Sequence, residues 1–448
     1  MKRLKVLVLA PDANPESIST SLVCCRHAEA LARLHTVTLV TRAANEPALR
    51  RAGAPFHGIE VINHPWLDRI FAWSMRRLFK NNFHNRIVTP FSYPFVVAFE
   101  CRTWLQLRNR IMAGEFDIVL RLSPINTVLP SAISFFLRRH PLPFVVGPIN
   151  GGLPWPKGFT QADNQRSGVD SLRNLYRFLP FARSTYRRAT AIIAGSSKTF
   201  AEFAHYREKL FFVPENAVSS SLCSGTARTF RPAARMELIF LGNLVPYKAC
   251  DLALRGAARF LRNGTAHFAV VGDGPERNRL EQLAKSLGIE DQVTFCGMLS
   301  HAQAMERLRV ADVLVFPSVR EFGGGVVFEA LAVGAVPLVA DFGGPGDIVN
   351  PKIGHKVRLT NEEEVVAQIE SFLTDLMNDP ELVNRLRKQG MTYARDHLTW
   401  DAKAQDTTRV LLWALQRGPK PDLVPPRMFP TGVDPSETHG TSRVENPA

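Results

Sequence analysis

The chain has 448 residues, of which 45% are hydrophobic and 21% charged, and its formal net charge at pH 7 is +14. This length predicts about two domains with extensions, because one hydrophobic core seldom serves so long a chain. The composition is that of an ordinary globular protein, and no stretch approaches the 18 or so uninterrupted apolar residues of a transmembrane helix.

The basic character belongs to the first half of the chain. Residues 1–195 contain 26 Lys and Arg against 11 Asp and Glu, whereas the remaining residues contain 29 against 30. This asymmetry indicates that the first half meets something anionic, such as a membrane surface, a phosphorylated acceptor or nucleic acid. The alternative is a basic surface that serves solubility alone.

Short apolar runs alternate with amphipathic segments along the chain, which predicts parallel strands joined by helical crossovers. The first run could pass for a weak signal peptide, but Pro11 and Asp12 end it so early that a buried strand fits better. The expected strands are Leu4–Leu9, Val37–Val40, Ile118–Leu122, Phe144–Val146, Ala191–Ala194, Leu210–Val213, Leu238–Leu241, His267–Val271, Val293–Phe295, Val313–Phe316 and Val336–Val339.

A Ser/Gly/Thr-rich stretch, Ser219–Thr229, divides these strands into two series. We therefore expect two doubly wound α/β domains that face each other, at residues 1–217 and 230–398. A helix at 399–417 closes the ordered part and is expected to cross back to the first domain. Residues 418–448 contain seven prolines in 31 positions, which predicts a disordered tail.

The cysteines form no C-x-x-C pair and have no metal-ligand spacing. This pattern predicts free thiols in a reducing compartment, and so a cytoplasmic protein. The six are Cys24, Cys25, Cys101, Cys223, Cys250 and Cys296.

Doubly wound sheets bind ligands beyond the carboxyl ends of their strands, and glycine-rich loops follow the strands of the second half. In F-L-G-N-L-V-P-Y-K, Gly242 ends a strand and Lys248 stands where it can reach an anion held by backbone amides; a solvated surface lysine is the alternative. The loop V-V-G-D-G-P-E-R has Arg277 where a dinucleotide fingerprint requires its third glycine, so a plain turn is favoured there.

The stretch R-E-F-G-G-G-V-V-F-E places three glycines between Glu321 and Glu329. Gly323, Gly324 and Gly325 would present bare amides at a helix N-terminus, which is a ready site for an anion. Glu329 lies in an apolar run, where an unpartnered carboxylate would be costly. In A-D-F-G-G-P-G-D, glycines follow the next strand and are as readily explained by a turn.

Several common catalytic patterns are missing from the sequence. There is no D-x-D, no H-E-x-x-H and no Cys/His cluster, so we expect no dedicated divalent-metal site. There is also no G-x-S-x-G and no G-x-x-x-x-G-K-[ST], which disfavours helicase and kinase interpretations of the basic half.

Taken in order, these loops resemble the nucleotide-sugar domain of family 4 retaining glycosyltransferases. The resemblance is dense over residues 236–350 and includes the complete E-x7-E signature at Glu321 and Glu329. It implies the GT-B fold, with two Rossmann-like domains on either side of a cleft. The first half is similar more loosely, through Phe144–Phe159, to bacterial members that build polysaccharides.

The resemblance also implies a role for each matched residue. Glu329 would accept hydrogen bonds from the ribose of a UDP- or GDP-linked donor, and Glu321 would contact the hydroxyls of the donor sugar. The amides of Gly323, Gly324 and Gly325 would hold sugar and diphosphate oxygens. Lys248 would neutralise the departing diphosphate. No further cofactor and no metal are implied, and the acceptor would be a saccharide or a lipid-linked saccharide of polysaccharide or glycolipid biosynthesis.

Two residues depart from the family pattern. Asn243 follows Gly242 where the family usually has Arg, and Asn150 stands where many members have a first-domain His. Asn150 would then position the sugar or a phosphate, while the leaving phosphate helps to deprotonate the acceptor. These departures motivate an alternative, a non-catalytic nucleotide-sugar-binding subunit; a nicotinamide-dependent dehydrogenase is a more distant one.

Residues 65–112 combine eight Lys and Arg with two acidic residues and many aromatic ones. Aromatic rings interleaved with arginine are typical of a membrane interface, which predicts a peripheral protein at the inner face of the cell membrane. Single-stranded nucleic acid could use the same mixture, but no nucleic-acid fold motif accompanies it. A core-packing insertion is the third interpretation.

Overall fold

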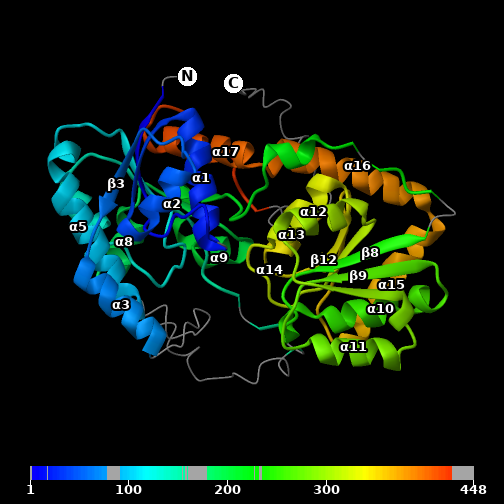
Figure 1. The fold of residues 1–448 in the computed structure, drawn as a ribbon. Helices are drawn as coiled ribbons and strands as arrows, with labels where there is room; N and C mark the ends of the chain where they lie inside the picture. The colour runs from blue at the N-terminus through cyan, green and yellow to red at the C-terminus, as the bar shows by residue number, and fades with distance from the viewer. Residues whose placement is uncertain are drawn as a thin grey trace, which may run out of the picture.

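The computed structural model describes residues 3–425 except 18, 78–90, 154, 157–158, 160–178, 227 and 232–234. Its described part forms two α/β domains side by side, each built on a parallel sheet (Figure 1). The predicted fold class, two Rossmann-like doubly wound domains, is confirmed.

The N-terminal domain has a seven-stranded sheet in the order β3-β2-β1-β4-β5-β6-β7. Its strands are β1 Lys5–Leu9, β2 Thr36–Arg42, β3 Gly58–Ile62, β4 Ile118–Arg121, β5 Phe144–Ile149, β6 Ala191–Ala194 and β7 Leu210–Phe212. Its helices are α1 Thr20–Leu34, α2 Glu46–Arg51, α3 Pro65–Arg77, α5 Tyr93–Met112, α6 Ile133–Phe136, α8 Ala182–Arg188 and α9 Ser197–Glu202.

Both faces of this sheet are covered, and β1 shows why the sequence requires it. Successive strand residues point to opposite faces, and all of β1 after Lys5 is apolar and buried. Val6 and Val8 enter the core that α1 helps to form, whereas Leu7 and Leu9 enter the core beneath α5. A central strand buried on both faces reads as a continuous apolar run, which explains the opening of the sequence.

The C-terminal domain has a six-stranded sheet in the order β10-β9-β8-β11-β12-β13. Its strands are β8 Met236–Leu241, β9 Ala266–Val271, β10 Val293–Gly297, β11 Val313–Phe316, β12 Val336–Ala340 and β13 His355–Val357. Its helices are α10 Cys250–Arg262, α11 Arg277–Ser286, α12 His301–Val310, α13 Gly325–Val333, α14 Gly343–Ile348, α15 Glu362–Asn378 and α16 Pro380–His397.

All eleven strands expected from the sequence are present, and the edge strands β3 and β13 are additional. β13 has only three residues and β3 is half-exposed for most of its length, so neither forms an apolar run. All six cysteines are free thiols, as expected. Among the described residues, no helix is both long and apolar enough to cross a membrane.

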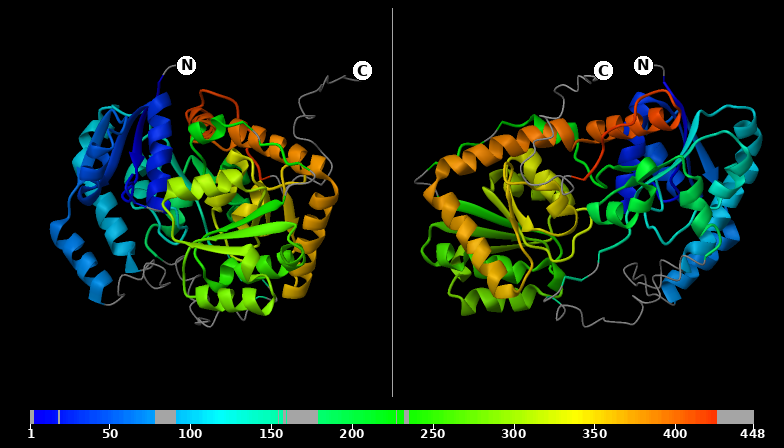
Figure 2. Two further views of the ribbon diagram at one scale, coloured as in Figure 1. Left: turned by 45° about the vertical axis from the view of Figure 1, so that its right-hand side comes forward. Right: turned by 180° about the vertical axis from the view of Figure 1, so that it is seen from behind.

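The last helix, α17 (Trp400–Ala414), lies on the N-terminal domain beside α1 (Figures 1 and 2). His27 Nε2 lies 2.9 Å from Thr407 Oγ1, and His35 Nε2 lies 2.8 Å from Thr408 Oγ1. The chain therefore crosses between the domains twice, once after β7 and once before α17. The two crossings are paired, because Val218 donates to Leu398 O at 2.9 Å and accepts from Trp400 N at 2.9 Å.

Part of the segment assigned to a disordered tail is instead ordered. Leu423 and Val424 pack against the N-terminal cores, and Leu423 O accepts a 2.7 Å hydrogen bond from Phe212 N of the edge strand β7. Packing of these two apolar side chains stabilises an ordered segment even though the neighbouring prolines predicted disorder. Residues 426–448 of the predicted tail lie outside the described residues.

Candidate active site

The glycine turn between β11 and α13 is closely packed and requires glycine at Gly324. Gly324 has φ +57°, and a Cβ there would lie 2.8 Å from Pro345 Cγ. A Cβ on Gly323 would lie 2.2 Å from Asn216 Nδ2, which is closer than van der Waals contact allows. Gly325 begins α13. The turn thus presents the amides of a helix N-terminus directly beside the segment that crosses from the first domain.

Lys248 and Glu321 form an ion pair, although they come from loops 73 residues apart in the chain. Their side chains are only 16% and 17% exposed. The Lys248 ammonium lies 5.0 Å from the centre of the Phe316 ring, and Glu321 Oε1 accepts a 3.3 Å hydrogen bond from Gly324 N. Glu321 therefore binds both the ammonium of Lys248 and the amide of Gly324. An anionic ligand would use the same two groups.

Glu329 lies one turn into α13 and pairs with a residue that the sequence did not indicate. His301 Nε2 lies 3.0 Å from Glu329 Oε1, and the Glu329 side chain is 23% exposed. Its hydrogen bond to Glu329 raises the pKa of His301 above its ordinary value. Glu329 is thus a half-buried carboxylate at the surface end of the apolar run, and not a fully buried one.

The other glycine loops support this turn. A Cβ on Gly343 would lie 2.1 Å from Glu321 O, and Gly344 N donates to the same carbonyl at 3.1 Å. A Cβ on Gly272 would lie 2.0 Å from Gly242 O. The glycines at 272 and 343 are therefore explained by close packing of one loop on another, as the turn interpretation expects.

Gly242 ends β8 beneath the Phe316 ring, and Asn243 beside it is exposed. Within the described residues, the Asn243 side chain makes no hydrogen bond to the protein. The structure thus places Gly242 next to the Lys248 loop, while Asn243 faces solvent with no partner of its own.

Asn150 lies at the end of β5 and is held by internal partners. Its Nδ2 donates to Glu215 Oε2 at 2.8 Å, and its Oδ1 lies 3.3 Å from both Ser196 Oγ and Thr199 Oγ1. Gly151 N also donates to Thr199 Oγ1, at 2.8 Å. Most of the hydrogen-bonding capacity at this position is thus used within the protein, and the structure joins Asn150 to Glu215 of the crossing segment.

Direct contacts hold the two domains together around these loops. Asp347 of α14 accepts hydrogen bonds from Ser197 N at 2.8 Å and Ser197 Oγ at 2.5 Å. Arg320 Nε donates to Leu153 O at 3.3 Å, and the Trp155 and Tyr247 rings meet edge to face. The site residues of the second domain therefore face the carboxyl ends of β5 and β6.

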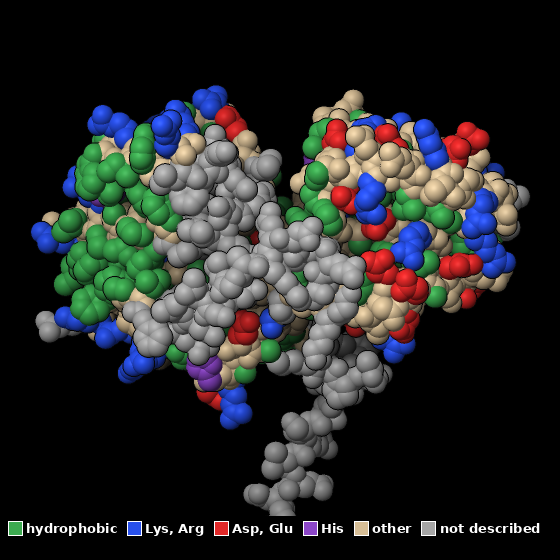
Figure 3. Space-filling view, turned by 90° about the horizontal axis from the view of Figure 1, so that it is seen from below, with side chains coloured by type: hydrophobic (Ala, Val, Ile, Leu, Met, Phe, Trp, Pro, Cys, Tyr) green, Lys and Arg blue, Asp and Glu red, His purple; other side chains and the backbone are tan. Residues whose placement is uncertain are grey.

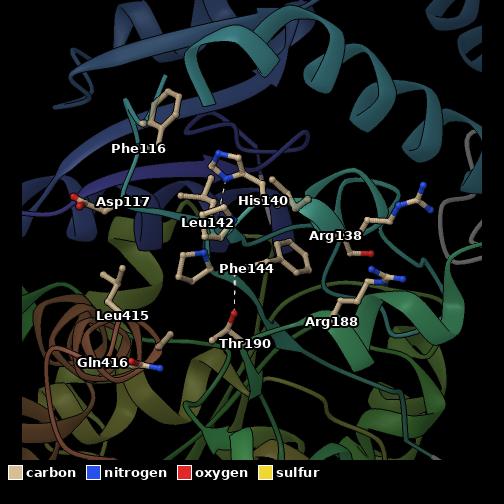
Figure 4. Close-up of a pocket in the computed structure, with 16 residues that line it drawn as sticks. Phe116, Asp117, Arg138, His140, Leu142, Phe144, Arg188, Thr190, Leu415 and Gln416 are labelled. Atoms are coloured by element: carbon tan, nitrogen blue, oxygen red, sulfur yellow. Dashed lines mark hydrogen bonds between the residues drawn. The ribbon is translucent and has the colours of Figure 1, made fainter. Parts of the chain in front are cut away.

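A separate cavity of about 740 Å³ lies in the N-terminal domain (Figure 4). It is lined by residues that precede β4, β5 and β6, among them Asp117, Leu142 and Thr190, and by the end of α17 at Leu415 and Gln416. These are the amino ends of the strands, whereas ligands of doubly wound domains bind at the carboxyl ends. This cavity is therefore distinct from the candidate site.

No cluster of three or more His, Cys, Asp or Glu side chains in the described part of the chain is placed to hold a metal ion. Lys248, Glu321 and Glu215 lie near the glycine turn, and each is engaged by another protein group.

Comparison with known proteins finds glycosyltransferases similar to the domain that carries this site. Residues 228–392 match the model of the glycosyl transferases group 1. D-inositol 3-phosphate glycosyltransferase of Streptomyces coelicolor is 32% identical over 201 residues, which cover 42% of this chain and 43% of the relative. An uncharacterized glycosyltransferase of Methanocaldococcus jannaschii is 28% identical over 180 residues, covering 40% and 45%. The aligned regions thus span less than half the length of either relative.

Among solved structures, HepE of Anabaena in complex with UDP superposes with a TM-score of 0.60 at 16% identity, covering 91% of this chain and 99% of HepE. At this level of identity the likeness concerns the fold. The chain therefore has the GT-B fold of glycosyltransferases, and its second domain matches the glycosyl transferases group 1.

Proposed function

We propose that the protein is a retaining glycosyltransferase of family 4 type, which moves a sugar from a UDP- or GDP-linked donor to a saccharide or lipid-linked acceptor without a metal ion. The observation that carries the proposal is the convergence of Lys248, Glu321 and the amides of the glycine turn at one edge of the domain that matches the group 1 family. These are the groups that a sugar diphosphate requires: a cation, amide donors and a carboxylate that accepts from hydroxyls.

Donor binding would exchange the internal contacts of the site for contacts with the ligand. The diphosphate carries more negative charge than one carboxylate, so it would draw Lys248 away from Glu321. Glu321 would then accept hydrogen bonds from the sugar hydroxyls, and the Gly324 amide that it now occupies would turn to a diphosphate oxygen. Lys248 would stabilise charge on the leaving group as the glycosidic bond breaks.

Glu329 would clamp the ribose of the donor. It lies one turn into α13, and His301 is its only hydrogen-bond partner within the described residues. Ribose hydroxyls would replace His301 on this carboxylate. Asn150 would act by position, because its amide is already engaged by Glu215, Ser196 and Thr199.

The proposal is tested with a panel of UDP- and GDP-linked sugars. A donor that binds only the folded state raises the melting temperature, and an acceptor extract should then release the free nucleotide. We expect EDTA to leave this release unchanged, since no metal takes part. A strong loss with EDTA that Mg²⁺ or Mn²⁺ restores would contradict the metal-independent mechanism.

The same panel distinguishes the proposed enzyme from the alternative, a non-catalytic nucleotide-sugar-binding subunit. Asn150 and Asn243, which replace the His and Arg of the family pattern, are the residues that favour a non-catalytic subunit. Binding of a nucleotide sugar without turnover in any acceptor extract would support that subunit. If neither UDP-linked nor GDP-linked sugars raise the melting temperature, both interpretations are contradicted.

The proposal includes a peripheral contact with an anionic membrane surface, made by the outer helices of the N-terminal domain. Trp66, Ile70 and Trp73 follow the i, i+4, i+7 spacing of one helix face on α3, and they are 60%, 46% and 60% exposed. Leu105 and Met112 form a second exposed stripe on α5. From below, apolar side chains gather on this domain with Lys and Arg around them (Figure 3).

This combination of rings and cations fits the interface of a bilayer with anionic lipid. The exposed Arg69, Arg76 and Arg77 lie on the same helix as the two tryptophans. The partly basic segment 78–90, which the sequence interpretation included, lies outside the described residues. The proposed location is accordingly the inner face of the cell membrane.

A vesicle sedimentation assay tests this contact. The wild type is expected to sediment with phosphatidylglycerol vesicles and to be released by salt, because the attraction is partly electrostatic. Replacing both Trp66 and Trp73 by alanine should weaken binding roughly tenfold. Met298→Ala is the matched control, since Met298 is 69% exposed but belongs to the other domain. Equal binding by the double variant and the control would contradict the assignment.

A further inference from the structure

A chain of buried polar groups runs through the point where the protein first crosses between its domains. Asn150, Glu215 and Lys403 are 7%, 7% and 4% exposed. Asn150 Nδ2 donates to Glu215 Oε2 at 2.8 Å, and the ammonium of Lys403 on α17 donates to the backbone carbonyl of Glu215. Three polar groups so deeply buried are costly unless they serve the fold or a ligand.

Two other buried ion pairs in the protein show what a purely structural arrangement looks like. Glu100 binds Arg121 through Oε1, and its Oε2 accepts from Ser131 Oγ and Ile133 N. Asp312 is equally saturated, with Arg387 on Oδ1 and Glu237 N on Oδ2. In both pairs every carboxylate oxygen has a protein partner, as structural burial requires.

Glu215 differs from both. Its Oε2 accepts from Asn150, but Lys403 binds its backbone and not its carboxylate. Within the described residues, Oε1 accepts no hydrogen bond. Oε1 is not fully buried, and it therefore retains access to solvent.

The open oxygen belongs to a carboxyl group that faces the glycine turn. The Cδ atom of Glu215 would lie 3.8 Å from a Cβ built on Gly323, and the neighbouring Asn216 closes on the same glycine. Burial raises the pKa of Glu215, and the negative charge of Glu321 adds to the rise. The carboxyl groups of Glu321 and Glu215 thus both lie beside the glycine turn.

We propose that Glu215 is a contact for the transferred sugar, made through Oε1 to a hydroxyl of that sugar, and that Asn150 and Lys403 position it. The inference rests on the proposed function, because it assigns a further residue to the same donor site. Asn150 fixes the orientation of the carboxyl group, and Lys403 fixes the backbone that carries it. Since Lys403 comes from α17, the last of the described helices contributes to the site without touching the ligand.

The experiment compares two ligands on the full-length protein. These are UDP and UDP-glucose, or GDP and GDP-mannose, whichever pair binds the wild type more tightly by titration. Glu215→Gln is expected to weaken binding of the nucleotide sugar about tenfold, the usual worth of a hydrogen bond to a charged group. The affinity for the matching nucleoside diphosphate should change less than about twofold, because only the sugar meets Glu215. Glu208→Gln, at a side chain 84% exposed, should alter neither affinity.

An equal loss of affinity for both ligands would show that Glu215 acts only on the fold. Unchanged affinity for both ligands would show that Glu215 does not contact the sugar. Each of these results overturns the inference. Where Glu215→Gln does not fold, Asn150→Ser decides, because it removes the donor and leaves the carboxylate. That variant should lose affinity for the nucleotide sugar alone, by about threefold. If the wild type binds neither ligand, the proposed function fails, and the inference fails with it.

Discussion

Replacing Lys248 by alanine is expected to lower the turnover of sugar transfer roughly 100- to 1,000-fold, the usual cost of removing a group that stabilises developing charge. Lys248 is the cation of the glycine turn, and its side chain is held by Glu321 in a largely buried position. Asn243 stands at the position where the resembled family usually has Arg, so Lys248 would carry more of this role. The measurement is nucleotide release at saturating donor.

A matched control separates this effect from a general loss of charge. Lys285 is exposed in the last turn of α11, and Lys285→Ala should retain full turnover. Lys248→Arg keeps the charge and should retain an intermediate activity. Turnover of Lys248→Ala within about threefold of the wild type would contradict the role assigned to Lys248.

Replacing Glu329 by alanine should weaken both the nucleoside diphosphate and the nucleotide sugar by 10-fold or more, since two ribose hydroxyls would lose their acceptor. Turnover at saturating donor should remain near that of the wild type, because the ribose does not take part in bond breaking. The two measurements are titration of the diphosphate and steady-state kinetics. A large loss of turnover with unchanged affinity would exclude Glu329 as the ribose clamp.

The His301–Glu329 pair adds a pH dependence to this affinity. Glu329 raises the pKa of His301, so His301 stays charged and holds the carboxylate at pH values where a free histidine is already neutral. As the pH rises through the raised pKa, above the ordinary value of about 6.5, His301 loses its charge and releases Glu329. Nucleotide affinity should therefore increase across this window, and His301→Ala should bind more tightly at low pH and lose the dependence.

The sequence predicted the strands that carry the site, and the reason is local. Apolar runs mark buried parallel strands, and the glycines that follow them mark the edge at which ligands bind. The convergence of Lys248 with Glu321 then follows from topology, because β8 and β11 are neighbours in the sheet. The roles given to these two residues, to Glu329, to Gly242 and to the glycine amides remain predictions.

The partners of these residues could not be predicted in the same way. His301 is 28 residues from Glu329, and Glu215 is 65 residues from Asn150. Neither spacing corresponds to a helix turn, a strand or a known motif, so only the folded chain brings them together. A single histidine after a strand or a single glutamate after Pro214 carries no local signal. The prediction that Asn150 positions the sugar or a phosphate stays a prediction, and the structure adds that its amide donates to Glu215.

The paired crossings have a consequence for how the chain can be recombined with that of a related protein. Residues 219–398 leave the first domain and return to it at a single point, where Val218 is bonded to Leu398 and Trp400. Residues 219–398, which include the segment that matches the group 1 family, can therefore be exchanged as one unit. The two junctions lie side by side, and α17 stays in place on α1. A chimera with boundaries at 218 and 399 would exchange Lys248, Glu321 and Glu329 together while keeping Glu215 and α17 of the first domain.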